Sequence, residues 1–146
     1  LPAVVEPGDH DTLVLLTTRP QRRAGVAVRM RIGVVVVVRA PGQIVRRLAP
    51  RGLHVRRGSG GFALELDVIN RGSVTETLDR GQVRLTLRRG PREVRLRAER
   101  RELRPTTSGL VQFHYRGRLR GWVTAHAAVS AGTGGQVVRR SFRVRL

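Results

Sequence analysis

Hydrophobic and polar residues alternate along most of this chain with a period of two. The clearest case is the stretch 62–70 (FALELDVIN), in which every second residue from Phe62 to Val68 is large and apolar. The stretch 83–88 repeats the pattern, with arginine or threonine at the intervening positions. Successive side chains of a strand point to opposite faces, so this alternation is typical of antiparallel strands with one buried face.

Two stretches near the start are more continuously apolar. Residues 11–18 (DTLVLLTT) lie between Pro-Gly and Arg-Pro pairs, which predicts a short buried strand. After an expected turn at 21–25, the chain first alternates and then becomes a run of valine. We therefore expect a strand 26–39 that passes from half exposed to buried on both faces. Gly33 lies where the pattern changes, and it predicts a β-bulge.

Turn residues punctuate the rest of the chain roughly every 8 to 12 residues, and no segment keeps a helical period. About eight to ten short strands arranged in this way predict an all-β, antiparallel immunoglobulin-like β-sandwich with almost no helix. The alternation assigns its expected core to Phe62, Leu64, Leu66, Val83, Leu85, Leu87, Val123, Phe142 and Val144.

A breaker at residues 40–42 (Ala-Pro-Gly) divides the chain into two parts. Residues 1–42 are interpreted as a β-hairpin or the tail of an upstream module, and residues 43–146 as the sandwich, with a connector at 46–52 and a short strand at 53–57. Two strands alone are marginal in water, so we expect the first part to pack on the second or to form a homodimer by strand pairing. Because residue 1 is leucine, we also expect that a leader or an upstream part has been removed.

The charge of the chain is strongly one-sided. All 29 basic residues are arginine, only ten carboxylates oppose them, and the formal net charge is +19. The exclusive use of arginine is typical of a GC-rich genome, but the sign of the charge still predicts attraction to polyanions such as wall polymers, nucleic acid or anionic lipid. The absence of cysteine from the sequence excludes a disulfide framework, a thiolate zinc site and a cysteine nucleophile.

Arginine doublets at predicted strand ends and the single tryptophan are the candidate binding residues. Trp122 points outward if Val123 and Ala125 face the core, where it would mark a contact surface, whereas a register shift would bury it. The candidate set is Arg88, Arg89, Arg100, Arg101, Trp122, Arg139 and Arg140.

The sequence gives little support for a catalytic or metal-binding function. The chain has no Gly-x-Ser-x-Gly motif, and the glycine-rich stretch 58–61 lacks the lysine and helix of a phosphate loop. His114 and His126, expected on adjacent strands, have no neighbouring carboxylate in sequence, and zinc needs three or four ligands. His10 lies between two aspartates, which a solvated turn explains. We therefore predict no enzyme activity, no metal site and no cofactor.

Two stretches carry a resemblance to a known family. The runs "FALELDVINRGSV" and "LRPTTSGLVQFHYRGRLRGWVTAHAAVS" resemble the second immunoglobulin-like module of bacterial WxL-interacting surface proteins and their actinobacterial relatives. The runs "PGDHDTLVLLTT" and "VAVRMRIGVVVVVRAPG" resemble the closing two strands of the module that precedes it. The resemblance implies a secreted, often membrane-anchored surface protein whose first module contacts peptidoglycan and whose second module contacts a host or matrix partner.

Two functions follow as expectations. The first is a non-catalytic, extracellular structural or adhesion module that binds an anionic cell-wall polymer or a surface protein. The alternative is an arginine-rich polyanion or nucleic-acid binder, although scarce aromatic residues make specific nucleic-acid recognition unexpected. The distribution of charge separates the two: an even spread of arginine over both sheets would weaken the binder, and eight or more arginines on one concave face would strengthen it.

Overall fold

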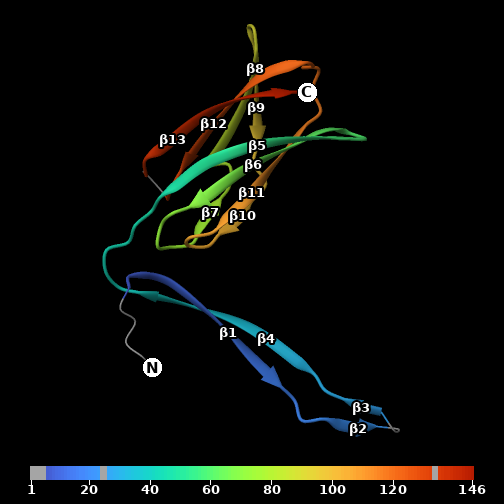
Figure 1. Ribbon diagram of the computed structural model, residues 1–146, viewed down its shortest axis with the longest axis vertical. Helices are drawn as coiled ribbons and strands as arrows, with labels where there is room; N and C mark the ends of the chain where they lie inside the picture. The colour runs from blue at the N-terminus through green and yellow to red at the C-terminus, as the bar shows by residue number, and fades with distance from the viewer. Residues whose placement is uncertain (1–5, 24–25, 133–134) are drawn as a thin grey trace. The chain divides into compact units, whose positions relative to one another are not determined.

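The computed structural model describes residues 6–23, 26–132 and 135–146, and these residues form antiparallel strands without any helix (Figure 1). The predicted all-β, antiparallel class is thus confirmed, while its immunoglobulin-like character stays a prediction. None of the described residues belongs to a helix long and apolar enough to cross a membrane. The chain divides into two compact units, residues 1–43 and 44–146, next to the boundary expected after residue 42.

The N-terminal unit is a pair of long strands with a second, short pair at its tip (Figure 1). β1 (Gly8–Thr17) pairs with β4 (Arg31–Ala40), and β2 (Gln21–Arg23) pairs with β3 (Val26–Val28). The single strand expected over 26–39 is therefore wrong, because the chain leaves the ladder at residues 29–30. Residues 21–23, expected as part of a turn, are in fact β2, and residues 24–25 lie outside the described part.

The bulge expected at Gly33 is also wrong. β1 and β4 keep one unbroken register, in which Gly33 lies opposite Leu15. Side chains across the strand fill the space that glycine leaves: Leu13 and Leu15 lie 3.4 and 3.5 Å from where a Cβ of Gly33 would be. The missing side chain is thus compensated by packing, without an inserted residue.

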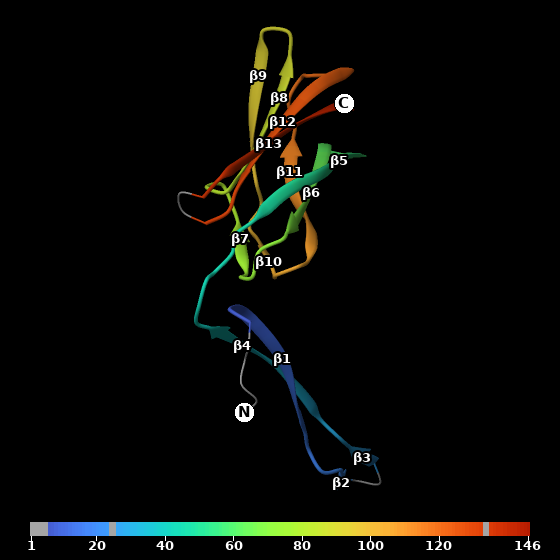
Figure 2. The ribbon, with the colours of Figure 1, turned by 60° about the vertical axis from the view of Figure 1, so that its left-hand side comes forward.

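The C-terminal unit is built mainly from two sheets (Figures 1 and 2). The first has the order β11-β6-β5, made of Ser108–Tyr115, Gly61–Asn70 and Leu48–Gly58. The second has the order β13-β12-β8-β9, made of Val137–Arg145, Trp122–Ser130, Val83–Arg89 and Arg92–Arg97. A small sheet pairs β10 (Arg101–Leu103) with β7 (Glu76–Leu78). Figure 2 shows the β8–β9 hairpin continuing the sheet beside β12.

β5 begins earlier than the sequence indicated. Most of the stretch expected as a connector, 46–52, belongs to this strand, which starts at Leu48. The register with β6 shifts between Pro50 and Gly52, so a bulge accommodates the proline, which has no N–H to donate to the ladder.

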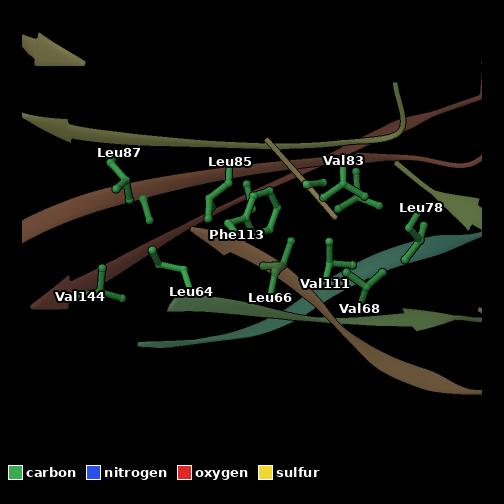
Figure 3. Close-up of a cluster of buried hydrophobic side chains, with 14 of the residues drawn as sticks. Leu64, Leu66, Val68, Leu78, Val83, Leu85, Leu87, Val111, Phe113 and Val144 are labelled. Atoms are coloured by element: carbon green, nitrogen blue, oxygen red, sulfur yellow. The ribbon is translucent and has the colours of Figure 1, made fainter. Parts of the chain in front are cut away.

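Aliphatic side chains from the two sheets meet in the core. In Figure 3, Leu64 and Leu66 of β6 point towards the layer that carries Leu85 and Leu87 of β8, and Phe113 lies between them near Leu85. Seven of the nine predicted core residues are buried in this cluster, and Phe62 and Phe142 are partly buried against it. The predicted core is therefore confirmed.

The outer strands of the two sheets are joined to one another. Ala98, just after β9, forms a bridge with Phe113 of β11, and Glu99 N donates to Gln112 O at 3.0 Å. On the other side, the Arg140 guanidinium of β13 donates to the Pro50 carbonyl of β5 at 3.3 Å. These contacts partly close the sandwich and protect its edges.

Asn70 ties three backbone segments together at the end of β6. Its side chain is fully buried, and Nδ2 donates to the carbonyls of Val74 and Leu103 at 2.8 and 3.0 Å. Its Oδ1 accepts from the backbone N–H of Gly72 at 2.8 Å. One side chain therefore satisfies three backbone groups that have little access to water.

Replacing Asn70 by alanine should lower the free energy of unfolding by about 3 kcal/mol, because each buried polar group left without a partner costs about 1–3 kcal/mol. Urea unfolding followed by the fluorescence of Trp122 measures this. Gln112→Ala, on an exposed position of β11, is the control and should change the free energy by less than about 0.5 kcal/mol. A loss for Asn70→Ala no larger than that of the control would contradict the assigned role.

Candidate polyanion-binding face

Arginine dominates the outward side of the four-stranded sheet. Along β8 the residues Val83, Leu85 and Leu87 are buried, so Arg84 and Arg88 between them point away from the core. The same parity on the neighbouring strands places further arginines on this side. We call the resulting surface the basic face, and its members are Arg84, Arg88, Arg95, Arg97, Arg139, Arg143 and Arg145.

The registers of the strands fix how these side chains neighbour one another. One row across the sheet runs from Arg139 through Ala128 and Arg84 to Arg97. Arg84 and Arg97 are direct cross-strand partners, so their Cβ atoms lie about 5 Å apart and two side chains of like charge are neighbours on one face. A sheet held together only for its own stability would avoid this pair, because like charges directly opposite are destabilising.

A hollow of about 480 Å³ lies on the basic face. Four arginines of the basic face line it, together with Arg80 from the loop before β8, Arg140 of β13 and the acidic Glu93; the four are Arg84, Arg95, Arg97 and Arg139. With Arg80 added to the seven strand residues, eight arginines gather on one hollowed side of the sheet. Polar groups that can bind an anion without charge repulsion also line the hollow, namely Thr86, His126 and Ser141.

Few carboxylates oppose these charges. Glu93 is the one acidic residue that the register places on this side, and its carboxylate lies 3.8 Å from the Arg95 guanidinium. In the described part of the chain, Arg95 is the only member of the basic face within salt-bridge distance of a carboxylate. The remaining guanidinium groups therefore keep most of their hydrogen-bonding capacity for a ligand.

The outward side of the three-stranded sheet has a different character. Glu65 and Asp67 of β6 lie on it, and each carboxylate is near one arginine: Arg56 at 3.1 Å and Arg51 at 3.8 Å. Positive and negative charges are therefore balanced on this side. A bias of codon usage towards arginine acts on the whole gene, so it does not explain why one sheet is neutralised and the other is not.

Trp122 marks one end of the basic face. Val123 and Ala125 are buried, so Trp122 faces outward, and its side chain is 55% exposed. The Arg143 guanidinium lies 5.1 Å from the centre of its ring, which is a cation–π contact. Of the two alternatives open from the sequence, the structure has the outward one.

The residues nominated from the sequence do not all lie together. Arg88, Arg139 and Trp122 are on or beside the basic face. Arg89, at the end of β8, donates to the carbonyl of Arg120, and Arg140 is directed to Pro50 of the other sheet. Arg100 and Arg101 are at the start of the small β10–β7 sheet, and the Arg100 guanidinium lies 3.8 Å from Glu102.

Arginine doublets do not reveal most of the basic face. Doublets place one side chain on each side of a strand, so they do not concentrate charge. The informative signal is arginine at every second position, as at Arg95 and Arg97 or Arg143 and Arg145. It becomes visible only when these strands are known to be neighbours.

The histidines do not converge on a metal site. His114 lies on β11 and His126 on β12, which belong to different sheets, so the expectation that they occupy adjacent strands is wrong. His114 Nε2 is 2.8 Å from Glu99 Oε1, and His126 Nδ1 is 2.9 Å from Ser141 Oγ. Among the residues that the structure describes, no group of three or more His, Asp and Glu side chains could hold a metal ion.

Comparison of the chain with protein-family models, with curated proteins and with solved structures gives no match.

The positive electrostatic potential of the basic face should be measurable through the quenching of Trp122 fluorescence by ions. We expect iodide to quench its fluorescence at least about three times more effectively than caesium at low salt, because the arginines attract the anion and repel the cation. The ratio should approach that of free N-acetyltryptophanamide above about 0.5 M salt, where charges more than a few ångströms apart are screened. An iodide-to-caesium ratio at low salt no larger than that of free N-acetyltryptophanamide would show that the face has no such potential.

Proposed function

We propose that this protein is a non-catalytic module of the cell surface that binds an anionic polymer through its basic face. The observation that carries the proposal is the gathering of eight arginines on one side of one sheet, with Arg84 directly opposite Arg97. Such an arrangement slightly lowers the stability of the isolated fold. This loss of stability is reversed when a polyanion neutralises the charges. Export to the surface and an immunoglobulin-like fold are parts of the proposal that rest on the family resemblance.

The spacing of the arginines on the basic face favours a flexible polymer with repeated charges as the ligand. Neighbouring strands lie about 4.8 Å apart, and alternate residues along a strand lie about 7 Å apart. The basic face is therefore a lattice of guanidinium groups, each able to bind a phosphate or carboxylate through two parallel hydrogen bonds. A chain of phosphates or acidic sugars can cross this lattice in several registers, which favours affinity for a polymer over recognition of one small ligand.

The scarcity of aromatic side chains separates a wall polymer from nucleic acid. Proteins that bind single strands stack several bases on aromatic rings, and the described part of the basic face offers Trp122 alone, already in contact with Arg143. An anionic wall polymer has no bases to stack. We therefore favour a polyol-phosphate or acidic polysaccharide ligand, and nucleic acid remains the comparison ligand in the test.

The test is binding of a purified poly(glycerol phosphate) by titration calorimetry or fluorescence anisotropy, with heparin and oligo(dT) as comparison ligands. We expect the logarithm of affinity to fall linearly with the logarithm of salt concentration, with a slope of about −5 to −6 if all seven strand arginines bind phosphate. Affinity that is equal at low and physiological salt would overturn the proposal. Tighter binding of oligo(dT) than of the other two polymers would favour the nucleic-acid alternative.

A matched pair of double variants assigns the binding to the basic face. Arg95→Gln with Arg97→Gln removes two charges from the face, and Arg100→Gln with Arg101→Gln removes two charges elsewhere. Each pair also removes one 3.8 Å ion pair with a glutamate, so their effects on the fold are comparable. The first double should weaken polymer binding more than about tenfold at 50 mM salt and make the salt slope shallower by about 1.5, while the second stays within about threefold. Equal losses would show that binding follows net charge and has no preferred face.

A further inference from the structure

The N-terminal hairpin exposes large apolar side chains on both of its sides. Because β1 and β4 pair in one register, their side chains sort into two faces. One of them, which we call the valine face, has Thr12 opposite Val36 at its centre and His10 opposite Val38 at one end, and it carries neither a carboxylate nor an arginine within β1 and β4. Its large apolar members, each 39–59% exposed, are Val14, Leu16, Ile32, Val34, Val36 and Val38.

The opposite face of the hairpin is charged at its two ends. Arg39 donates to both carboxylate oxygens of Asp9, with distances of 2.6 and 3.0 Å, and Arg31 lies at the far end of the same face. Asp11 is also on this side. Between the charged ends lie Leu13, Leu15, Val35 and Val37. The valine face is therefore the face without carboxylate or arginine, whereas the opposite face combines charged ends with exposed leucine and valine side chains.

We propose that two copies of the chain associate by stacking their valine faces, so that two hairpins form a small four-stranded sandwich. A two-stranded hairpin is marginal by itself, and covering one face supplies the apolar burial that it lacks. Strand pairing alone, the mode expected from the sequence, would satisfy the edges of the hairpin but leave both apolar faces in water. Face stacking puts the valine face inside and the Asp9–Arg39 ion pair outside.

Charge determines which surface a second copy of the chain can contact. Each chain has a formal net charge of +19, so two copies repel one another wherever their arginines approach. The valine face is the part of the described hairpin strands where contact brings no arginine against arginine. An anionic partner, by contrast, finds no guanidinium group on it. An aliphatic surface of valine, leucine and isoleucine is also complementary to itself, since its contacts are non-directional.

The area of the valine face determines how strongly two copies of the chain are expected to associate. A buried Val or Leu side chain corresponds to about 60–120 Å² of apolar area, so six half-exposed ones contribute very roughly 200–350 Å² per copy. A stable interface buries about 1,200–2,000 Å² in total, and this contact is well below that range. The dimer should therefore be weak and reversible, with a dissociation constant in the micromolar to millimolar range.

The test is sedimentation equilibrium or light scattering of the whole chain from about 1 µM to about 2 mM, a range that extends past the weakest dissociation constant expected. The weight-average mass should rise with concentration towards twice the monomer mass. It should rise further in about 0.5 M salt, because salt screens the repulsion between the two +19 chains. This response is opposite in sign to that of polymer binding, so the two proposals fail independently. A monomer at every concentration and salt level, or growth beyond a dimer, would overturn the proposal.

Neighbouring valines of β4 supply a matched control. Val34→Thr with Val36→Thr changes the valine face, and Val35→Thr with Val37→Thr makes the same chemical change on the opposite face of the same strand. Threonine keeps the β-branched shape, so far-UV circular dichroism should stay unchanged in both. The first double should raise the dissociation constant at least about tenfold, because it buries hydroxyl groups in the interface, while the second stays within about threefold. Equal effects of the two doubles, or a larger effect of the second, would show that the valine face is not the contact surface.

Discussion

Aliphatic packing between the two sheets of the C-terminal unit is the constraint on which the rest of that unit depends. Leu64 and Leu66 of β6 and Leu85 and Leu87 of β8 are completely shielded from water. Since a strand has a period of two, fixing Leu85 and Leu87 inward forces Arg84 and Arg88 outward, and a shift of one residue would bury both charges. The basic face is therefore specified by the same pattern that specifies the core, and it cannot be rearranged without unfolding the sheet.

The features that depend on a single strand could be predicted from the sequence. Alternation over 62–70 and 83–88 gave the correct inward residues, because parity is a local property. For Trp122 parity left two alternatives open, and the structure has the outward one. Errors arose where a neighbouring strand decides the outcome. Gly33 needs no bulge because Leu13 and Leu15 from β1 fill its place, and Pro50 lies inside β5 because its bulge against β6 accommodates it.

The candidate site could not be predicted because it depends on the order of strands within sheets. In sequence, the doublet at Arg100 and Arg101 looks the same as the doublet at Arg88 and Arg89. In space, Arg88 belongs to the four-stranded sheet, whereas residues 100–101 lead into a separate two-stranded one. No local pattern shows that β12 lies between β13 and β8, and that placement brings arginines from the middle and from the C-terminal end of the sandwich sequence onto one surface.

The basic face is compatible with the fold because its energetic cost is small beside that of the core. A like-charged cross-strand pair such as Arg84 and Arg97 costs roughly 0.2–1 kcal/mol, whereas each buried leucine contributes about 1.5–3 kcal/mol. The fold therefore tolerates these arginines, but it does not require them: threonine, which occupies position 86 on the same face, suits a strand better and carries no charge. A GC-rich codon bias would account for the choice of arginine over lysine. Such a bias does not explain the choice of arginine over threonine at seven positions of one sheet face while the outward face of the other sheet keeps its carboxylates, whereas the anionic ligand that we propose would account for it.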